Sequence, residues 1–229
     1  MHREIHKSRH ITVLILATII FFLGILVGAQ VEQFRLEKIE AQFKEQSRLS
    51  EEMQAEIEFI DYLISIHKHN ETNCRGVVSS FLESIQKLDN VVFSLERYES
   101  SAIARHDEYL ELKESYFNLQ TRYYILANRI NSLCPNSFDT ILYFYTYDRD
   151  CPECEDQGLF LSHIKRKHTD NVMIFSYNIQ SESTIVSILT QTNSIKSYQT
   201  PTLIINSKHK LGFSNVGQIE KYLEVSVKN

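Results

Sequence analysis

The residues of this chain best suited to chemistry are Cys151-Pro152-Glu153-Cys154. Two cysteines three positions apart on one helical turn can form and break a disulfide without backbone movement. Later in the chain, Thr200-Pro201 directly precedes an apolar segment. A cis peptide bond there would face such a cysteine pair. These residues together predict thiol–disulfide exchange, with Cys151 and Cys154 as the catalytic residues.

The start of a helix is a favourable place for this motif. With Cys151 as the N-cap, Pro152 becomes the first helical residue and loses no hydrogen bond, because proline has no N–H. The free backbone donors and the helix dipole then stabilise a thiolate on Cys151. This thiolate attacks a partner disulfide, and Cys154 resolves the mixed disulfide.

Acidic residues crowd the same helix start. They compete with a thiolate for the positive potential there, and Arg149 offsets them only in part. We therefore expect a Cys151 that is less acidic than that of strong thiol oxidases, and a more reducing couple. The acidic residues are Asp150, Glu153, Glu155 and Asp156.

Beyond Pro135 the hydrophobic pattern alternates between strand-like and helical segments. The segment 140–147 is aromatic and β-branched on both faces, as in a buried central strand. The expected order is strand, helix, strand, helix, strand, strand, helix. The expected strands are 140–147, 172–177, 202–206 and 211–213, and the expected helices are 152–168, 181–195 and 216–227.

This order, with CxxC at the first strand–helix junction and a proline before the third strand, resembles the thioredoxin superfamily over residues 138–229. The resemblance implies an α/β thioredoxin-like domain (βαβαββα) whose central sheet is flanked by helices. It implies that Cys151 is the exposed nucleophile and Cys154 the buried resolving thiol. It also implies a cis Pro201 beside both, with Thr200 lining a groove for an extended substrate.

Two features depart from that family. Tyr145 stands where thioredoxins bury an aspartate, so a thioredoxin-style proton relay is not expected. No Gly-Gly pair precedes the last helix, so a glutaredoxin-type glutathione site is not expected either. The expected partners are protein thiols and disulfides and a redox partner protein, which could be embedded in a membrane. No cofactor is expected.

Two other functions compete with thiol exchange. The first is metal binding by Cys151 and Cys154 with His163 and His168, in a spacing shorter than that of the usual zinc finger. Surface histidines on a helix explain the same residues. The second is a non-catalytic scaffold that uses the C-terminal domain only to grip a partner, although such a scaffold needs neither cysteine.

Residues 31–134 carry helical periodicity and predict a stalk followed by an antiparallel helical hairpin with a turn near 98–106. Cys74 precedes the hairpin and Cys134 ends it. A chain that folds back near its midpoint brings the two together as a structural disulfide, whereas one unbroken helix keeps them apart. Two unrelated thiols remain the alternative.

The segment 11–29 contains no charged residue and predicts a transmembrane helix. Val27-Gly28-Ala29 also resembles a signal-peptidase site, but the length of the run favours a retained anchor. The expected arrangement is single-pass, with a cytoplasmic tail at 1–10 and the C-terminal domain outside the cytoplasm. Gly24 and Gly28 either form a face for a homodimer, together with the stalk, or are ordinary small residues of such a helix.

The overall charge excludes one class of partner. The chain has 24 basic and 29 acidic residues without a long run of either sign. A nucleic-acid surface is therefore not expected.

Overall fold

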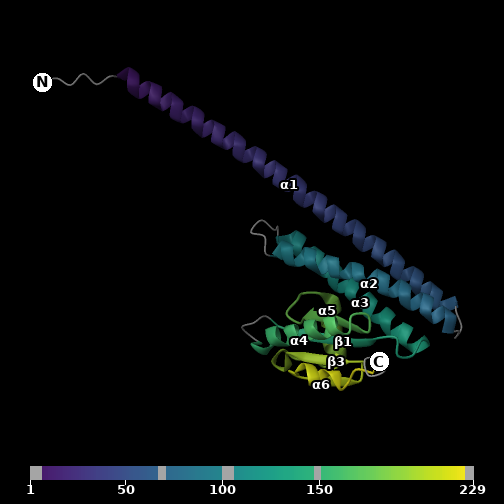
Figure 1. Ribbon diagram of the computed structural model, residues 1–229. Coiled ribbons are helices and arrows are strands. Elements are labelled where there is room, and N and C mark those ends of the chain that lie inside the picture. Colours follow the sequence, from purple (N-terminus) through teal and green to yellow (C-terminus); the bar gives the residue numbers. More distant parts are fainter. Residues whose placement is uncertain (1–6, 67–70, 100–105, 147–150, 225–229) are drawn as a thin grey trace. The chain divides into compact units, whose positions relative to one another are not determined.

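A computed structural model describes residues 7–66, 71–99, 106–146 and 151–224 of the chain (Figure 1). The chain divides into two compact units, 1–49 and 50–229, and each is considered by itself. The elements in chain order are α1 (Lys7–Ile66), α2 (Glu71–Glu99), α3 (His106–Leu133), β1 (Asp139–Tyr145), α4 (Glu153–Lys167), β2 (Val172–Asn178), α5 (Thr184–Thr192), the 3₁₀ turn η1 (Ser197–Gln199), β3 (Thr202–Ile205), β4 (His209–Leu211) and α6 (Val216–Glu220).

The first unit contains the N-terminal part of α1, and its described side chains over 14–28 are exposed. A bilayer core about 30 Å thick needs roughly 20 consecutive apolar residues. Within the described ranges, no helix combines enough length with enough apolar character to cross a membrane. The transmembrane helix expected at 11–29 is therefore wrong. The predicted localisation, a single-pass protein with its C-terminal domain outside the cytoplasm, is therefore wrong as well.

The second unit begins with three helical segments: the end of α1 from Ser50, then α2 and α3. The apolar residues of α1 recur at helical spacing, so they form one buried stripe. The buried residues of this stripe are Met53, Ile57, Ile60 and Ile64. The helices α2 and α3 pack against each other. Most of the turn predicted between them, 100–105, lies outside the described residues.

The sheet contains four strands in the order β2-β1-β3-β4. Strand β1 pairs parallel with β2, Asp139 opposite Val172, and antiparallel with β3, Phe144 opposite Thr202. Strands β3 and β4 form an antiparallel hairpin. The central strand β1 is buried along nearly its whole length, as its continuous apolar and aromatic sequence predicts.

The two faces of the sheet are covered by different helices (Figure 1). Alternate residues of a strand point to opposite faces, so β1 contributes to both cores. Ile141 and Tyr143 belong to a core shared with α4 and the C-terminal residues around α6. On the other face, α3 packs against β1, β2 and α5. There the ring of Tyr177 lies 6.1 Å from that of Phe117.

The helical layer and the sheet are joined through buried contacts. The side chain of Gln120 on α3 donates to the carbonyl of Ser176 at 2.9 Å and accepts from its N–H at 3.2 Å. The ring of Phe81 on α2 lies 4.9 Å from that of Phe138, just before β1. The helical pair is thus part of the same compact unit as the sheet.

The predicted fold class is wrong as a description of this chain. The described residues form six α-helices and one 3₁₀ turn around a small four-stranded mixed sheet. The helices α1, α2 and α3 alone span 60, 29 and 28 residues. The chain is therefore mostly helical, with no membrane-spanning helix in the described part, and it is not a clear thioredoxin fold.

Candidate active site

The cysteine pair lies at the N-terminal end of α4 and is bonded as a disulfide, with Cα atoms 5.4 Å apart. The N–H of Cys154 donates to the carbonyl of Cys151 at 3.1 Å, so the first turn already starts at Cys151. Pro152 has helical backbone angles (φ −59°, ψ −28°), although α4 formally begins at Glu153. The N-cap of α4 is therefore Pro152, and Cys151, which was expected at the N-cap, lies one position before it, at the start of the first turn.

The two half-cystines lie just beneath the surface. Cys151 is 3% exposed and Cys154 is 5% exposed, while Pro152 and Glu153 between them are exposed. The resemblance implied an exposed Cys151, but in this disulfide it is as buried as its partner. In the bonded form its sulfur is directed at Cys154 and not at solvent.

Exposed acidic side chains surround the helix start. Glu153, Glu155 and Asp156 all lie in the first turn of α4, and none of them is buried. Negative charge in this position favours the helix and disfavours a thiolate at its tip. Arg149 and Asp150 lie outside the described residues.

Thr200 and Pro201 directly precede β3, beside the C-terminal end of β1. The antiparallel pairing of Phe144 with Thr202 continues toward Thr146 and Thr200, whose hydroxyl oxygens are 3.1 Å apart. The Thr200–Pro201 peptide bond is cis, and Pro201 is buried. Tyr143 bonds the carbonyl of Cys154 and Thr146 lies against Thr200, so both motifs adjoin the C-terminal part of β1.

The turn before the proline is internally bonded. The N–H of Thr200 donates to the carbonyl of Ser197 at 3.3 Å, and its hydroxyl donates to the same carbonyl at 2.8 Å. The hydroxyl of Thr202 donates to the carbonyl of Gln199 at 2.5 Å. These bonds fix the backbone that leads into the proline.

Two buried polar residues beneath the pair were not predicted from the sequence. The hydroxyl of Tyr143 donates to the carbonyl of Cys154 at 2.7 Å, and its ring stacks on that of Tyr145 at 5.2 Å. Gln157 is fully buried, and its amide bonds both the N–H and the carbonyl of Ser214. A glutamine on the apolar face of a predicted helix was the signal that could have identified Gln157.

The residues of the alternative metal site do not lie close enough together to bind one ion. His163 and His168 are nine and fourteen residues beyond Cys154 on the same helix, or roughly 14 and 21 Å along its axis. Bonds of about 2 Å to one ion cannot bridge these separations. His168 instead lies 3.1 Å from Glu220, whose pKa is lowered by its hydrogen bonds to Lys167 and His168. In the described part of the chain, no cluster of three or more candidate ligands is found.

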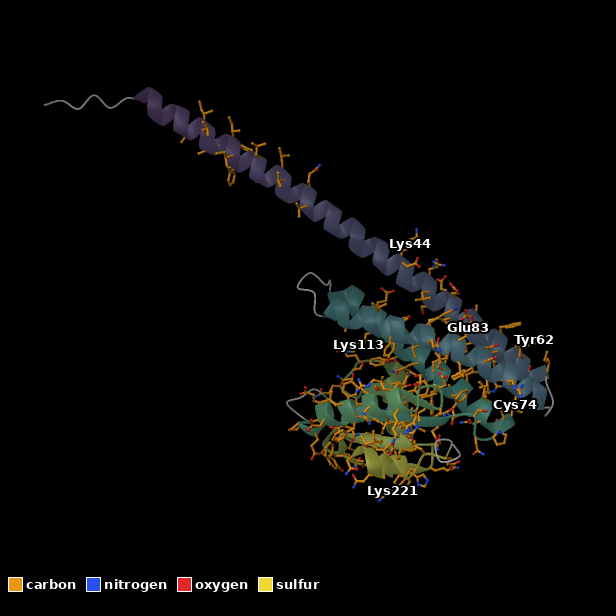
Figure 2. All side chains as sticks on the ribbon, in the orientation of Figure 1. Lys44, Tyr62, Cys74, Glu83, Lys113 and Lys221 are labelled. Atoms are coloured by element: carbon orange, nitrogen blue, oxygen red, sulfur yellow. A yellow bond between two sulfur atoms is a disulfide. The ribbon has the colours of Figure 1, made fainter. Side chains whose placement is uncertain are left out.

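The second disulfide, Cys74–Cys134, lies in the helical layer (Figure 2). It connects the beginning of α2 to the residue that follows α3, with a sequence separation of 60. Cys74 is half-buried and Cys134 is buried. Both pairs are thus bonded, and the described residues include no free cysteine.

Comparisons with known proteins give little further information. No protein-family model matches the chain, and no curated protein matches it. One solved structure, described as the structure of a malarial protein, is similar over 38% of this chain and 99% of that chain. It has 19% sequence identity and a TM-score of 0.31, which is too low to support an argument about fold or function.

Proposed function

We propose that the protein is a thiol–disulfide oxidoreductase that acts on protein thiols and disulfides through Cys151 and Cys154. The proposal depends on one observation: the two cysteines are bonded to each other across the first turn of α4. A disulfide that closes so short a segment constrains little of the unfolded chain, so a structural role explains it poorly. An exchange role explains both its spacing and its place at a helix N-terminus.

The reaction balances without a cofactor. In the reducing direction, the Cys151 thiolate attacks one sulfur of a client disulfide and releases the other client sulfur as a thiolate. The Cys154 thiolate then attacks the Cys151 sulfur, which forms the Cys151–Cys154 disulfide and releases the second client thiolate. Two electrons pass from the pair to the client, and the released thiolates take up protons from water. The reverse sequence oxidises a client dithiol.

Trapping of the mixed disulfide is the direct test. In Cys154→Ser the second step is blocked, so clients stay bonded to Cys151 and can be identified by mass spectrometry after non-reducing separation. Cys151→Ser in the same background removes the nucleophile and is the matched control. We expect adducts with the first variant and none with the double variant. Equal adducts in both would overturn the proposal.

The Cys74–Cys134 pair provides a second control. Double replacement of these residues by alanine leaves the pair on α4 intact, so trapping by Cys151 should persist in that background. If adducts disappear when Cys74 and Cys134 are replaced, exchange belongs to that pair and not to Cys151–Cys154, which would contradict the proposal. A scaffold function predicts that a client binds equally well when both residues of the α4 pair are serine.

A further inference from the structure

The strand that leads to the cysteine pair also makes a direct bond to it. Tyr143 lies on β1 and is 5% exposed. Its hydroxyl donates to the backbone carbonyl of Cys154 at 2.7 Å, and this bond is buried. The contact therefore ties the first turn of α4 to the central strand of the sheet.

The position of Tyr143 is itself firmly held. Its ring belongs to the core formed with Leu161 and Ile164 of α4. It also stacks on the ring of Tyr145, with the centroids 5.2 Å apart. A buried aromatic ring in such surroundings has few alternative rotamers, so its hydroxyl is a fixed point and not a mobile donor.

The bond reaches one cysteine of the pair through its peptide group. When the disulfide is reduced, the two sulfurs must move apart to non-bonded distance. The carbonyl of Cys154 is held by the hydroxyl of Tyr143 on the sheet, whereas the hydrogen bond to the carbonyl of Cys151 comes from within the same turn, from the N–H of Cys154 at 3.1 Å. On reduction, therefore, the Cys151 sulfur makes most of the movement. The Cys154 sulfur stays close to the position from which it attacks a mixed disulfide on Cys151.

We propose that Tyr143 is a positioning residue for exchange: its hydroxyl holds the Cys154 peptide so that the resolving sulfur stays within reach of Cys151. This inference rests on the proposed function. It identifies a residue that influences the equilibrium between the disulfide and the dithiol form of the Cys151–Cys154 pair. A group held near its reaction partner has a high effective concentration, which favours the disulfide over the dithiol. Loss of the hydroxyl should lower that concentration and make the couple more oxidising.

The test compares two tyrosines that each lose one buried hydroxyl. Tyr143→Phe removes the bond to Cys154, and Tyr177→Phe removes a bond of 2.9 Å to the hydroxyl of Thr121 on the opposite face of the sheet. Both variants and the wild type are equilibrated in glutathione redox buffers, and their free thiols are alkylated and counted by mass. The same samples are checked for folding by circular dichroism.

We expect the equilibrium of Tyr143→Phe to move toward the dithiol by about three- to tenfold, or roughly 14–30 mV. The glutathione adduct on Cys151 should also resolve more slowly in this variant. Tyr177→Phe should lose similar stability but keep the wild-type equilibrium. Tyr143→Leu, which removes the ring as well, should shift the equilibrium at least as far.

The outcomes separate the inference from the proposed function. If the wild-type pair does not exchange with glutathione, the proposed function and this inference are both wrong. If the wild type exchanges and Tyr143→Phe behaves as Tyr177→Phe does, the inference alone is overturned. A shift with Tyr143→Leu but none with Tyr143→Phe would assign the effect to ring packing and would also overturn it.

Discussion

The side-chain amide of Gln157 makes two hydrogen bonds with the backbone of Ser214, accepting from its N–H at 2.8 Å and donating to its carbonyl at 3.1 Å. Gln157 is fully buried on α4, one turn after Cys154, and Ser214 lies in the loop before α6. The pair therefore fixes this loop to the helix that bears the cysteines.

Replacement of Gln157 by methionine should reduce the free energy of unfolding by about 2–4 kcal/mol, because both backbone groups of Ser214 lose their buried partners. Urea unfolding at neutral pH measures this change. Gln191→Met is the matched control, because Gln191 is an exposed glutamine on α5. Its effect should stay within about 0.5 kcal/mol. Equal effects of the two variants would contradict the prediction.

Removal of the Cys74–Cys134 disulfide should destabilise the protein. The Cys151–Cys154 pair on α4 should still exchange with glutathione. The disulfide spans a sequence separation of 60, for which the chain-entropy model gives about 4 kcal/mol. Urea unfolding of the Cys74→Ala, Cys134→Ala double variant measures the loss, and glutathione equilibration measures the α4 pair. A loss well below 1 kcal/mol would show that the helical pair does not depend on this closure.

Neutralisation of the acidic residues at the start of α4 should favour the Cys151 thiolate. The triple variant Glu153→Gln, Glu155→Gln, Asp156→Asn removes three exposed negative charges from the first turn. We expect the pKa of the Cys151 thiol to fall, because less negative charge opposes the thiolate, and the couple to become more oxidising. The rate of thiol alkylation against pH measures the pKa.

The triple variant Glu83→Gln, Asp170→Asn, Glu182→Gln, which removes three exposed charges outside α4, is the control for net charge in that experiment. The change in the pKa of the Cys151 thiol should be largest at low salt, because dissolved salt screens interactions between exposed charges. An unchanged pKa in the α4 triple variant would mean that the acidic residues do not restrain the nucleophile.

Alkaline pH should weaken the helical layer through Tyr123. Burial raises the pKa of Tyr123 to about 12, and its hydroxyl lies 2.6 Å from that of Ser84. The folded pKa is above the unfolded value near 10, so this stability is complete below about pH 10 and is lost as the pH rises toward 12. The loss should be on the order of 2 kcal/mol.

Tyr123→Phe tests that prediction because its ring cannot ionise. At pH 7 the variant should be less stable than the wild type by about 1 kcal/mol, since the hydrogen bond is lost. Urea midpoints measured between pH 8 and 11 should show this difference shrinking above pH 10. A constant difference across that range would exclude Tyr123 as the titrating group.

Individual elements near the cysteines were predictable because their signals are local. A helix was expected over 152–168 and α4 is Glu153–Lys167, while a strand was expected over 172–177 and β2 is Val172–Asn178. Periodicity and a proline at the helix start determine such boundaries. The Cys151–Cys154 pair followed from its spacing, whereas the Cys74–Cys134 pair was expected only if the chain between them folded back as a hairpin.

The larger arrangement was not predictable by the same means. The apolar run at 11–29 predicted a membrane helix that the described residues do not contain, and the predicted thioredoxin-like fold class was wrong for the chain as well. The bonds of Tyr143 to Cys154 and of Gln157 to Ser214 join residues that are separated in the chain. Contacts of this kind depend on which layers meet, and no local pattern records them.

The contact between Gln120 and Ser176 has a consequence for association. Strand β2 is an edge strand of the sheet. In a parallel edge strand, every second residue directs both its backbone N–H and its backbone C=O away from the neighbouring strand. At Ser176 the amide of Gln120 occupies both groups, as the backbone of an additional strand would. The backbone of Ser176 is thereby withdrawn from pairing with a β-strand of another molecule, which makes this part of the edge strand a poorer template for edge-to-edge association.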